Sequence, residues 1–318
     1  MKNIAILTSG GDSQGMNAYI SKFVMLLNKH KKNVYGIMRG FQGLIDEDFV
    51  LLGSQMVENI SFLGGSYLKT ARCIEFYEEA GVEKAYKILI KHKIDLLVVV
   101  GGNGSFKGAI NLSKKGMKII CIPGTIDNDL YFSNISLGFD TAVHNAVDSI
   151  EKIKQTMLSN NRGVVIEVMG RNCGNIALST AISVNANALV VGEDKNSLDC
   201  VERNVLYAIK NGTKSPVVIL QENICDGLEL ASILQKRTNK QFKFERLGYV
   251  QRGGEPTVKD KIFANLLAIQ TVNSILNNEF NIAIGMKKEN IFTTSLDKVF
   301  CAKSNFNKNL YELYLSNL

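Results

Sequence analysis

The chain has 318 residues, of which 46% are hydrophobic and 21% are charged, as is typical of a globular protein that is long enough to bury a sizeable core. The formal net charge of +7 comes from scattered lysines rather than a basic run, so the sequence favours an anionic small ligand over nucleic acid. Six separated cysteines without a Cys-x-x-Cys pair, and three separated histidines, favour reduced thiols and argue against zinc.

The sequence also argues against a membrane-spanning or secreted protein. No apolar run reaches the roughly 18 residues that span a bilayer, and the first strand begins near residue 3, which leaves no room for a signal peptide. We therefore expect a cytoplasmic protein that does not bind a membrane.

Strand, glycine loop and helix recur along the chain over residues 3–30, 95–115 and 162–184. In the middle unit, residues 95–100 are a strand of core character, and a helix is expected from Phe106 to Lys115. Other expected strands are 34–38, 117–122, 189–191, 216–220 and 242–250, other expected helices are 82–92, 139–158, 198–211, 227–237 and 259–277, and residues 39–43 form a loop. Such alternation predicts an α/β fold with parallel sheets and right-handed crossovers, and the recurrence suggests two similar halves.

Two carboxylates, Asp127 and Asp129, follow the apolar strand at 117–122. In open α/β sheets ligands bind at the carboxyl ends of strands, and we expect the glycine loops to line up along that edge. If Pro123–Asp129 is extended, both carboxylates share a face, so that one could take a proton and the other hold Mg²⁺. The alternative is an Asp/Asn turn that hydrogen-bonds to itself.

The glycine loops Gly10–Gly11 and Gly101–Ser105 expose backbone N–H groups that suit a phosphate. Neither has the GxGxxG or GxxxxGK[ST] spacing, so a dinucleotide site and a Walker loop are not supported, and tight turns remain the alternative. Three arginines also lie at strand or loop edges, where their planar fork can bind phosphate: Arg162, Arg171 and Arg252. Together these features favour phosphoryl transfer.

Five motifs in order carry a resemblance to the bacterial ATP-dependent 6-phosphofructokinase family. They are Leu7–Asn17, Gly101–Ser105, Pro123–Asp129, Glu167–Arg171 and Gln251–Gly254. The resemblance runs from residue 1 to about residue 300 with the spacing intact. It implies two parallel-sheet α/β domains with the active site in the cleft between them: an ATP-binding domain (1–138 plus 251–301) and a sugar-phosphate-binding domain (139–250 plus 302–318).

The resemblance implies phosphorylation of fructose 6-phosphate by ATP and Mg²⁺, the committed step of glycolysis. Asp127 would take the proton from the C1 hydroxyl, and Thr125 and Arg171 would stabilise the transferring phosphoryl group. The implied ATP contacts are Gly11, Arg72, Cys73, Gly102, Asn103, Gly104, Ser105 and Gly108, the last leaving room for adenosine. The implied sugar-phosphate contacts are Thr125, Ile126, Asp127, Arg162, Met169, Gly170, Arg171, Glu222, Lys243, Tyr249 and Arg252. Asn103 and Asp129 are the implied Mg²⁺ ligands.

The resemblance also implies a homotetramer, in which Arg162 and Lys243 reach the site of a neighbouring subunit. It implies ATP rather than pyrophosphate as the donor, because pyrophosphate-using members carry Asp and Lys where this chain has Gly104 and Gly124. An Asp at position 104 would crowd and repel the α-phosphate region of ATP.

Three positions depart from the family pattern: Asn103 replaces an Asp, Lys243 an Arg and Tyr249 a His. They raise the alternatives of a weak or inactive paralogue with a regulatory or binding role, of a mixed oligomer with an active sibling subunit, and of another phosphorylated ketose as acceptor. The family's basic effector-site residues are replaced by Ser21, Met25, Ser54, Asn187, Asn211 and Thr213, with Lys154 remaining. We therefore expect weak or absent activation by ADP.

Overall fold

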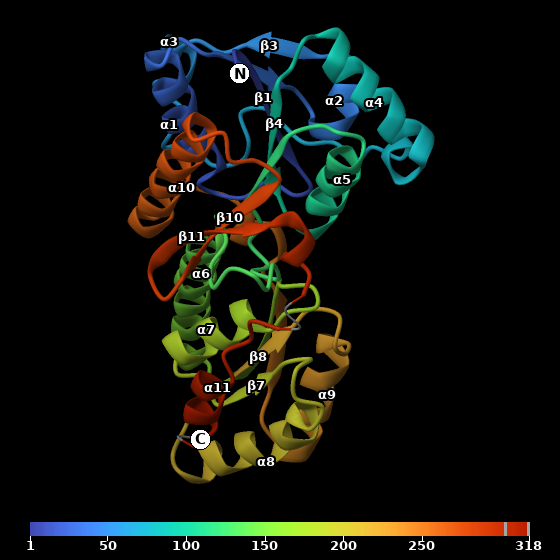
Figure 1. The fold of residues 1–318 in the computed structure, drawn as a ribbon. Coiled ribbons are helices and arrows are strands. Elements are labelled where there is room, and N and C mark those ends of the chain that lie inside the picture. Colours follow the sequence, from blue (N-terminus) through green and yellow to red (C-terminus); the bar gives the residue numbers. More distant parts are fainter. Residues whose placement is uncertain (302–303, 317–318) are drawn as a thin grey trace. The chain divides into compact units, whose positions relative to one another are not determined.

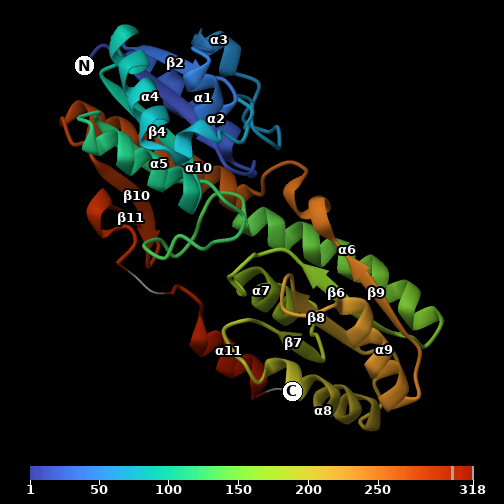
Figure 2. The same ribbon diagram turned by 90° about the vertical axis from the view of Figure 1, so that its right-hand side faces the viewer.

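The computed structural model describes residues 1–301 and 304–316 (Figures 1 and 2), so part of the predicted segment 302–318 lies outside the described residues. The chain divides into two compact units. The first comprises Met1–Thr141 and Arg252–Asn305, and the second comprises Ala142–Gln251 and Phe306–Leu318. Helix α6 (Phe139–Ser159) carries the chain from the first unit into the second.

The first unit contains a seven-stranded sheet. Its order is β11 (Asn290–Ser295), β10 (Ile282–Lys287), β5 (Ile119–Pro123), β4 (Leu96–Gly101), β1 (Asn3–Ser9), β2 (Asn33–Ile37) and β3 (Phe49–Leu51). The five central strands are parallel, whereas β3 and β11 pair antiparallel at the two edges. The predicted parallel α/β architecture is confirmed.

Helices cover both faces of this sheet. Helices α1 (Met16–Lys29) and α10 (Val258–Leu276) pack on one face together with the short α3 (Ser54–Val57), and α2 (Gly40–Ile45), α4 (Glu79–Lys91) and α5 (Asn103–Lys114) pack on the other (Figure 2). Strand β4 is buried along its whole length because Val98 and Val100 face the first set of helices, and Leu97 and Val99 face the second. Its unbroken apolar sequence is thus explained by two buried faces.

The second unit contains a smaller sheet of four parallel strands. The order is β7 (Ala188–Val190), β8 (Val217–Gln221), β6 (Gly163–Val168) and β9 (Phe242–Arg246). Helices α8 (Ser197–Lys210) and α9 (Gly227–Thr238) share a core on one face, and α7 (Asn175–Ser183) packs against β7 and β8. Both units thus have parallel α/β sheets, as the recurrence suggested, but the sheets differ in size, with seven strands and four.

Several element boundaries differ from those expected. Residues 40–45 form a helix rather than a loop, because Phe41 and Leu44 are buried against the sheet. Helix α5 begins at Asn103 rather than Phe106, and β9 ends at Arg246 before a 3-10 helix at Gly248–Arg252.

Further elements lie in the C-terminal region. It contains the β10–β11 hairpin and helix α11 (Lys308–Leu315). Lys288 and Glu289 adopt the positive φ angles of the two-residue turn in this hairpin, where glycine or asparagine is usual. The turn residues therefore did not indicate a hairpin in the sequence. Among the described residues, no helix is long and apolar enough to cross a membrane.

Candidate functional site

Three polar loops begin side by side at one edge of the first sheet. In the strand register, Ser9 lies opposite Gly101, and Gly101 lies opposite Pro123. The expectation that the glycine loops line up is therefore confirmed for the loops after β1, β4 and β5. The chain leaves β1 towards β2 and leaves the adjacent β4 towards β5, in the opposite direction. This is a topological switch point, where ligands bind in open α/β sheets.

The N-terminus of helix α5 lies at this switch point. The first helical hydrogen bond is donated by Phe106 N to Gly102 O at 3.1 Å, so the N–H groups of residues 103–105 have no acceptor within the helix. The hydroxyl of Ser105 is buried and has no hydrogen-bond partner among the described residues. Free N–H groups, a helix dipole and an unpartnered hydroxyl together fit a phosphate group.

Two glycines that the sequence linked to the donor differ in their surroundings. A Cβ atom added to Gly104 would meet no heavy atom within 4 Å, so a side chain there would extend into open space. A Cβ added to Gly124 would lie 2.8 Å from Val100 Cγ1 and 2.9 Å from Met16 Cε. Position 104 is therefore free to vary without disturbing the fold, whereas position 124 is filled by the core.

The other residues expected to contact adenosine lie against aromatic rings. Gly108 faces the stacked rings of Phe41 and Phe76, and carbon atoms of both would lie 3.1 Å from an added Cβ. The room expected beside Gly108 is thus filled by these two rings in this structure. Cys73 is buried, which raises the pKa of its thiol, and Arg72 is exposed.

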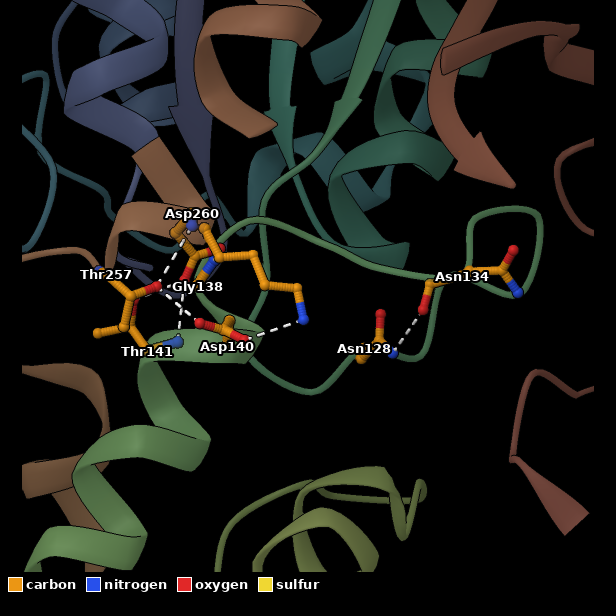
Figure 3. Close-up of polar contacts among 8 residues, drawn as sticks. Asn128, Asn134, Gly138, Asp140, Thr141, Thr257 and Asp260 are labelled. Atoms are coloured by element: carbon orange, nitrogen blue, oxygen red, sulfur yellow. Dashed lines mark hydrogen bonds and ion pairs between the residues drawn. The ribbon is translucent and has the colours of Figure 1, made fainter. Parts of the chain in front are cut away.

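The loop after β5 is a turn rather than an extended segment. Asn128 adopts the left-handed conformation, with φ of 51°, so the argument that Asp127 and Asp129 share a strand face is wrong. Internal hydrogen bonds hold the loop: Asn128 Nδ2 donates to Asn134 O at 3.1 Å (Figure 3), and Ser136 Oγ donates to Thr125 O at 2.6 Å. Asp127 and Ile126 are buried within this turn.

The two implied metal ligands lie close together. Asn103 Nδ2 donates to the backbone oxygen of Asp129 at 3.2 Å, which brings the end of the β5 loop to the start of α5. No three His, Cys, Asp or Glu side chains within the described part of the chain group as a metal cage. Mg²⁺ commonly takes one or two carboxylates plus phosphate oxygens, so this donor set fits a metal that arrives with a phosphate.

Arg252 has a partner that sequence reasoning missed. Its guanidinium forms an ion pair with Asp12, in the loop after β1. Gly11 allows this approach, because a Cβ there would lie 2.8 Å from Arg252 Nη2. The signal was present in the sequence as an acidic residue directly after two glycines, but its partner lies 240 positions away.

In the second unit, the loop Met169–Arg171 follows β6 and is held by two side chains. Glu222 Oε1 accepts hydrogen bonds from Gly170 N at 3.0 Å and from Arg171 N at 2.8 Å. Gln251 Oε1 accepts from Met169 N at 3.2 Å. Glu222, which was expected to contact the sugar, therefore orients the loop, and Gln251 is a further positioning residue.

A cavity of about 200 Å³ adjoins this loop. Its lining includes three predicted sugar-phosphate residues, Met169, Glu222 and Tyr249, together with Glu167 and Arg246, which were not predicted to bind. Arg246 forms an ion pair of 2.6 Å with the buried Glu167. The cavity thus combines a cation, carboxylates and an exposed tyrosine, which can recognise a phosphorylated polyol.

Arg162 and Lys243 do not join this group. Both lie at the amino end of the sheet, where Val164 pairs with Lys243, and Arg162 Nε donates to Gln241 Oε1 at 2.8 Å. Arg162 precedes Met169 by seven residues, and Val164, which pairs with Lys243, precedes it by five; at about 3.3 Å per residue these are about 23 Å and about 17 Å. These two cations therefore cannot serve the cavity of their own chain.

Three of the expected effector positions, Asn187, Asn211 and Thr213, line a second cavity of about 570 Å³ in this unit. Its walls come from α8 and α11, and none of the described residues that line it is charged. Nearby, Lys154 Nζ donates to the backbone oxygen of Val184 at 2.7 Å. The cavity therefore offers amides, hydroxyls and apolar groups to a ligand.

Comparison with known proteins gives a consistent result. A family model described as phosphofructokinase matches residues 3–275. The chain is 41% identical over 315 residues to an ATP-dependent 6-phosphofructokinase of Caldanaerobacter subterraneus subsp. tengcongensis and 40% identical over 313 residues to one of Clostridioides difficile, covering 98% of each chain in both cases.

Solved structures agree. The phosphofructokinase of Pichia pastoris matches with a TM-score of 0.92 at 27% identity, over 99% of this chain and 39% of that one. The chain likewise spans about half of the matching Saccharomyces cerevisiae phosphofructokinase chain, with a TM-score of 0.88 at 27% identity and 99% of this chain covered. The expected resemblance is confirmed, and the chain belongs to the phosphofructokinase family.

Proposed function

We propose that this chain is an ATP-dependent 6-phosphofructokinase, a glycolytic kinase that converts fructose 6-phosphate and ATP to fructose 1,6-bisphosphate and ADP. The observation that carries this proposal is the 41% identity, over 98% of both chains, to a bacterial enzyme of that name. The relatives do not favour the weak or inactive alternative that Asn103 and Tyr249 suggested.

ATP would bind at the switch point of the first unit. The N–H groups of residues 103–105 and the unpartnered Ser105 hydroxyl would hold its phosphates, and Gly11 and Gly102 would let the chain approach closely. The other proposed contacts, towards the nucleoside, are Arg72, Cys73 and Gly108, and contact at Gly108 would require the rings of Phe41 and Phe76 to move aside. The open space beside Gly104 supports ATP as the donor.

Asp127 is the proposed general base. Its carboxylate would accept the proton of the C1 hydroxyl as the oxygen bonds to the γ-phosphorus and the bond to the β-phosphate oxygen breaks. Thr125 and Arg171 would stabilise the negative charge that spreads over the transferring group. The hydrogen bonds that fix the turn around Asn128 support this assignment, because a general base acts efficiently only when its position is fixed.

Mg²⁺ would be held by Asp129 and the Asn103 amide oxygen together with phosphate oxygens, and it would neutralise phosphate charge. Because Asn103 brings no charge, Asp129 would be the only anionic protein ligand of this pair. Release of Asn103 Nδ2 from the Asp129 carbonyl would accompany any rotation of the amide towards the metal.

Fructose 6-phosphate would bind in the 200 Å³ cavity of the second unit. The proposed contacts there are Met169, Gly170, Glu222 and Tyr249, and Ile126 and Arg252 are proposed as further contacts of the sugar phosphate. In this scheme the first unit is the ATP domain and the second the sugar-phosphate domain. A cytoplasmic location follows from the role in glycolysis.

We further propose a homotetramer. Arg162 and Lys243 lie about 17 Å or more from their own loop at Met169, so they would act on the sugar phosphate of a neighbouring subunit. A mixing experiment tests this: Arg162→Ala and Asp127→Asn chains should each be inactive alone, but co-refolded mixtures should regain activity. Regain arises because an Asp127→Asn chain can lend its Arg162 to a partner that keeps Asp127. Absence of any regain in verified mixed oligomers would contradict shared sites.

The function itself is tested by a coupled assay with Mg²⁺ and fructose 6-phosphate, using ATP and pyrophosphate in parallel as donors. We expect turnover with ATP and none with pyrophosphate. Turnover with pyrophosphate alone would overturn the donor assignment, and a panel of other phosphorylated ketoses would reveal a different acceptor.

A further inference from the structure

Helices α6 and α10 begin side by side in the first unit, and each caps the other (Figure 3). The carboxylate of Asp260, in the first turn of α10, accepts hydrogen bonds from Gly138 N at 3.0 Å and Thr141 N at 2.9 Å. It also accepts one from Thr141 Oγ1 at 2.5 Å. The free N–H groups at the start of α6 are therefore satisfied by a side chain 119 or more positions away.

The return contacts come from α6. Thr257, the N-cap residue of α10, donates from N to Thr141 Oγ1 at 3.0 Å and from Oγ1 to Asp140 Oδ2 at 2.7 Å. Thr257 Oγ1 also accepts from Asp260 N at 3.3 Å. Each hydroxyl thus donates once and accepts once, which is all that one proton per hydroxyl allows. We call Asp140, Thr141, Thr257 and Asp260 the reciprocal cap.

Two of the four residues of the reciprocal cap are buried, and the other two, Asp140 and Thr257, are half-buried. Asp260 and Thr141 are both fully buried. An exposed Ser or Asp would cap α6 without the desolvation of a carboxylate, as Asp226 does for α9, where its Oδ1 accepts from Leu228 N and Glu229 N. A buried carboxylate that is satisfied from both helices fixes their geometry more strictly than an exposed cap can.

The reciprocal cap joins two segments that carry site residues. Gly138 ends the segment that starts at Thr125, and within it Ser136 Oγ bonds to Thr125 O. Arg252 and Gly253 lie in the segment that leads to Thr257 and α10, and Gly253 O accepts a hydrogen bond from Gln14 Nε2 at 2.7 Å. The base-bearing loop is thus tied to the buried carboxylate directly through Gly138, and the Arg252 segment is tied to it through Thr257 and the Thr141 hydroxyl.

We infer that Asp260 is a positioning residue, which acts through the reciprocal cap to hold the loop of Asp127 in register with the segment of Arg252. The inference rests on the proposed function for its effect on turnover but not for its effect on the loop. Asp260 itself contacts neither reactant in this scheme. Its loss should let the loop drift, and a displacement of about 1 Å in a catalytic group can cost about 100-fold in rate.

Two pairs of variants test the inference through turnover. Asp260→Asn replaces an acceptor with an amide that faces N–H donors, and Thr141→Val removes the hydroxyl, whereas Thr141→Ser keeps it. We expect kcat to fall about 10- to 100-fold in the first two with a much smaller change in KM for ATP, and to stay near wild type in Thr141→Ser. Asp226→Ala, which removes the cap of α9, is the matched control and should leave kcat unchanged.

Amide hydrogen exchange supplies a readout that does not depend on turnover. Residues 125–137 should exchange faster in Asp260→Asn and Thr141→Val than in wild type and Asp226→Ala, at a temperature where all are folded. Unchanged exchange in this segment, or wild-type kcat in both variants, would overturn the inference. If wild type lacks turnover while the two variants still exchange faster than wild type over residues 125–137, the proposed function is overturned and the positioning role remains supported.

Discussion

The substitution Gly104→Asp should have opposite effects on the stability of the first unit and on its affinity for ATP. Gly104 is the second residue of α5, is exposed, and has open space where a Cβ would lie. Removing a helical glycine stabilises by about 0.5–1 kcal/mol, and an acidic residue near a helix N-terminus adds about 0.3–1 kcal/mol. The variant should therefore unfold at the same urea concentration as wild type or a higher one.

Its effect on ATP should be opposite and large. A carboxylate within about 5 Å of a phosphate charge is repelled by roughly 3 kcal/mol at an effective dielectric constant of about 20, which is about two orders of magnitude in affinity. We expect KM for ATP to rise about 100-fold in Gly104→Asp, whereas Gly104→Ala, which adds no charge, should stay within a few-fold of wild type. Equal KM values for the two variants would refute the placement of the phosphates at α5.

Three further predictions concern the metal, the reciprocal cap and the second cavity. Asn103→Asp, which adds a second carboxylate beside Asp129, should lower the Mg²⁺ concentration for half-maximal rate several-fold, and an unchanged Mg²⁺ titration would argue against residue 103 as a ligand. Burial raises the pKa of Asp260, so its contribution to stability is complete below the unfolded pKa of about 3.9 and is lost as pH rises through the folded value. As pH rises from about 3.9 through the folded pKa of Asp260, the unfolding free energy of wild type should fall relative to that of Asp260→Asn. A rise in this difference over the same pH range would contradict the prediction. Calorimetry should find no ADP binding in the uncharged cavity below millimolar concentration until Asn211→Lys and Thr213→Lys supply charge, whereas tight binding by wild type would refute this.

The parts of the site that could be predicted from the sequence are those set by strand direction. Parallel strands end at a common edge, so the loops that follow the apolar runs of β1, β4 and β5 had to meet there, and Ser9, Gly101 and Pro123 do lie in one row. The apolar run of β4 likewise required two covered faces. Both follow from local composition and topology.

What could not be predicted depends on partners far away in the chain. The left-handed Asn128 is held by Asn134 and by Asn305 Nδ2, which donates to Asn128 O at 2.9 Å across 177 positions. Gly138 meets Asp260 across 122 positions. An Asp or Asn has many local conformations of similar energy, so such distant hydrogen bonds, and not the local sequence, select the one that is adopted.

The cations near the amino end of β9 show a third limit on what can be predicted from one chain. The resemblance implied that Arg162 and Lys243 reach the site of a neighbouring subunit, and the strand register puts both at the end of their own sheet that is remote from the loop at Met169. A single chain therefore accounts for the loop at Met169 and the cavity beside it, but not for these two cations. Their proposed use depends on assembly, which lies outside the information in one chain's secondary structure.

The most direct test of the central claim is the initial rate at which ³¹P NMR detects fructose 1,6-bisphosphate from ATP, Mg²⁺ and fructose 6-phosphate, compared between wild type and Asp127→Asn. The account predicts product with wild type and a rate at least about 100-fold lower with Asp127→Asn, at an unchanged unfolding midpoint, because the base is lost and the shape is kept. A folded Asp127→Asn variant with a near-wild-type rate would contradict Asp127 as the base, and a wild type that forms no fructose 1,6-bisphosphate would contradict the proposed activity.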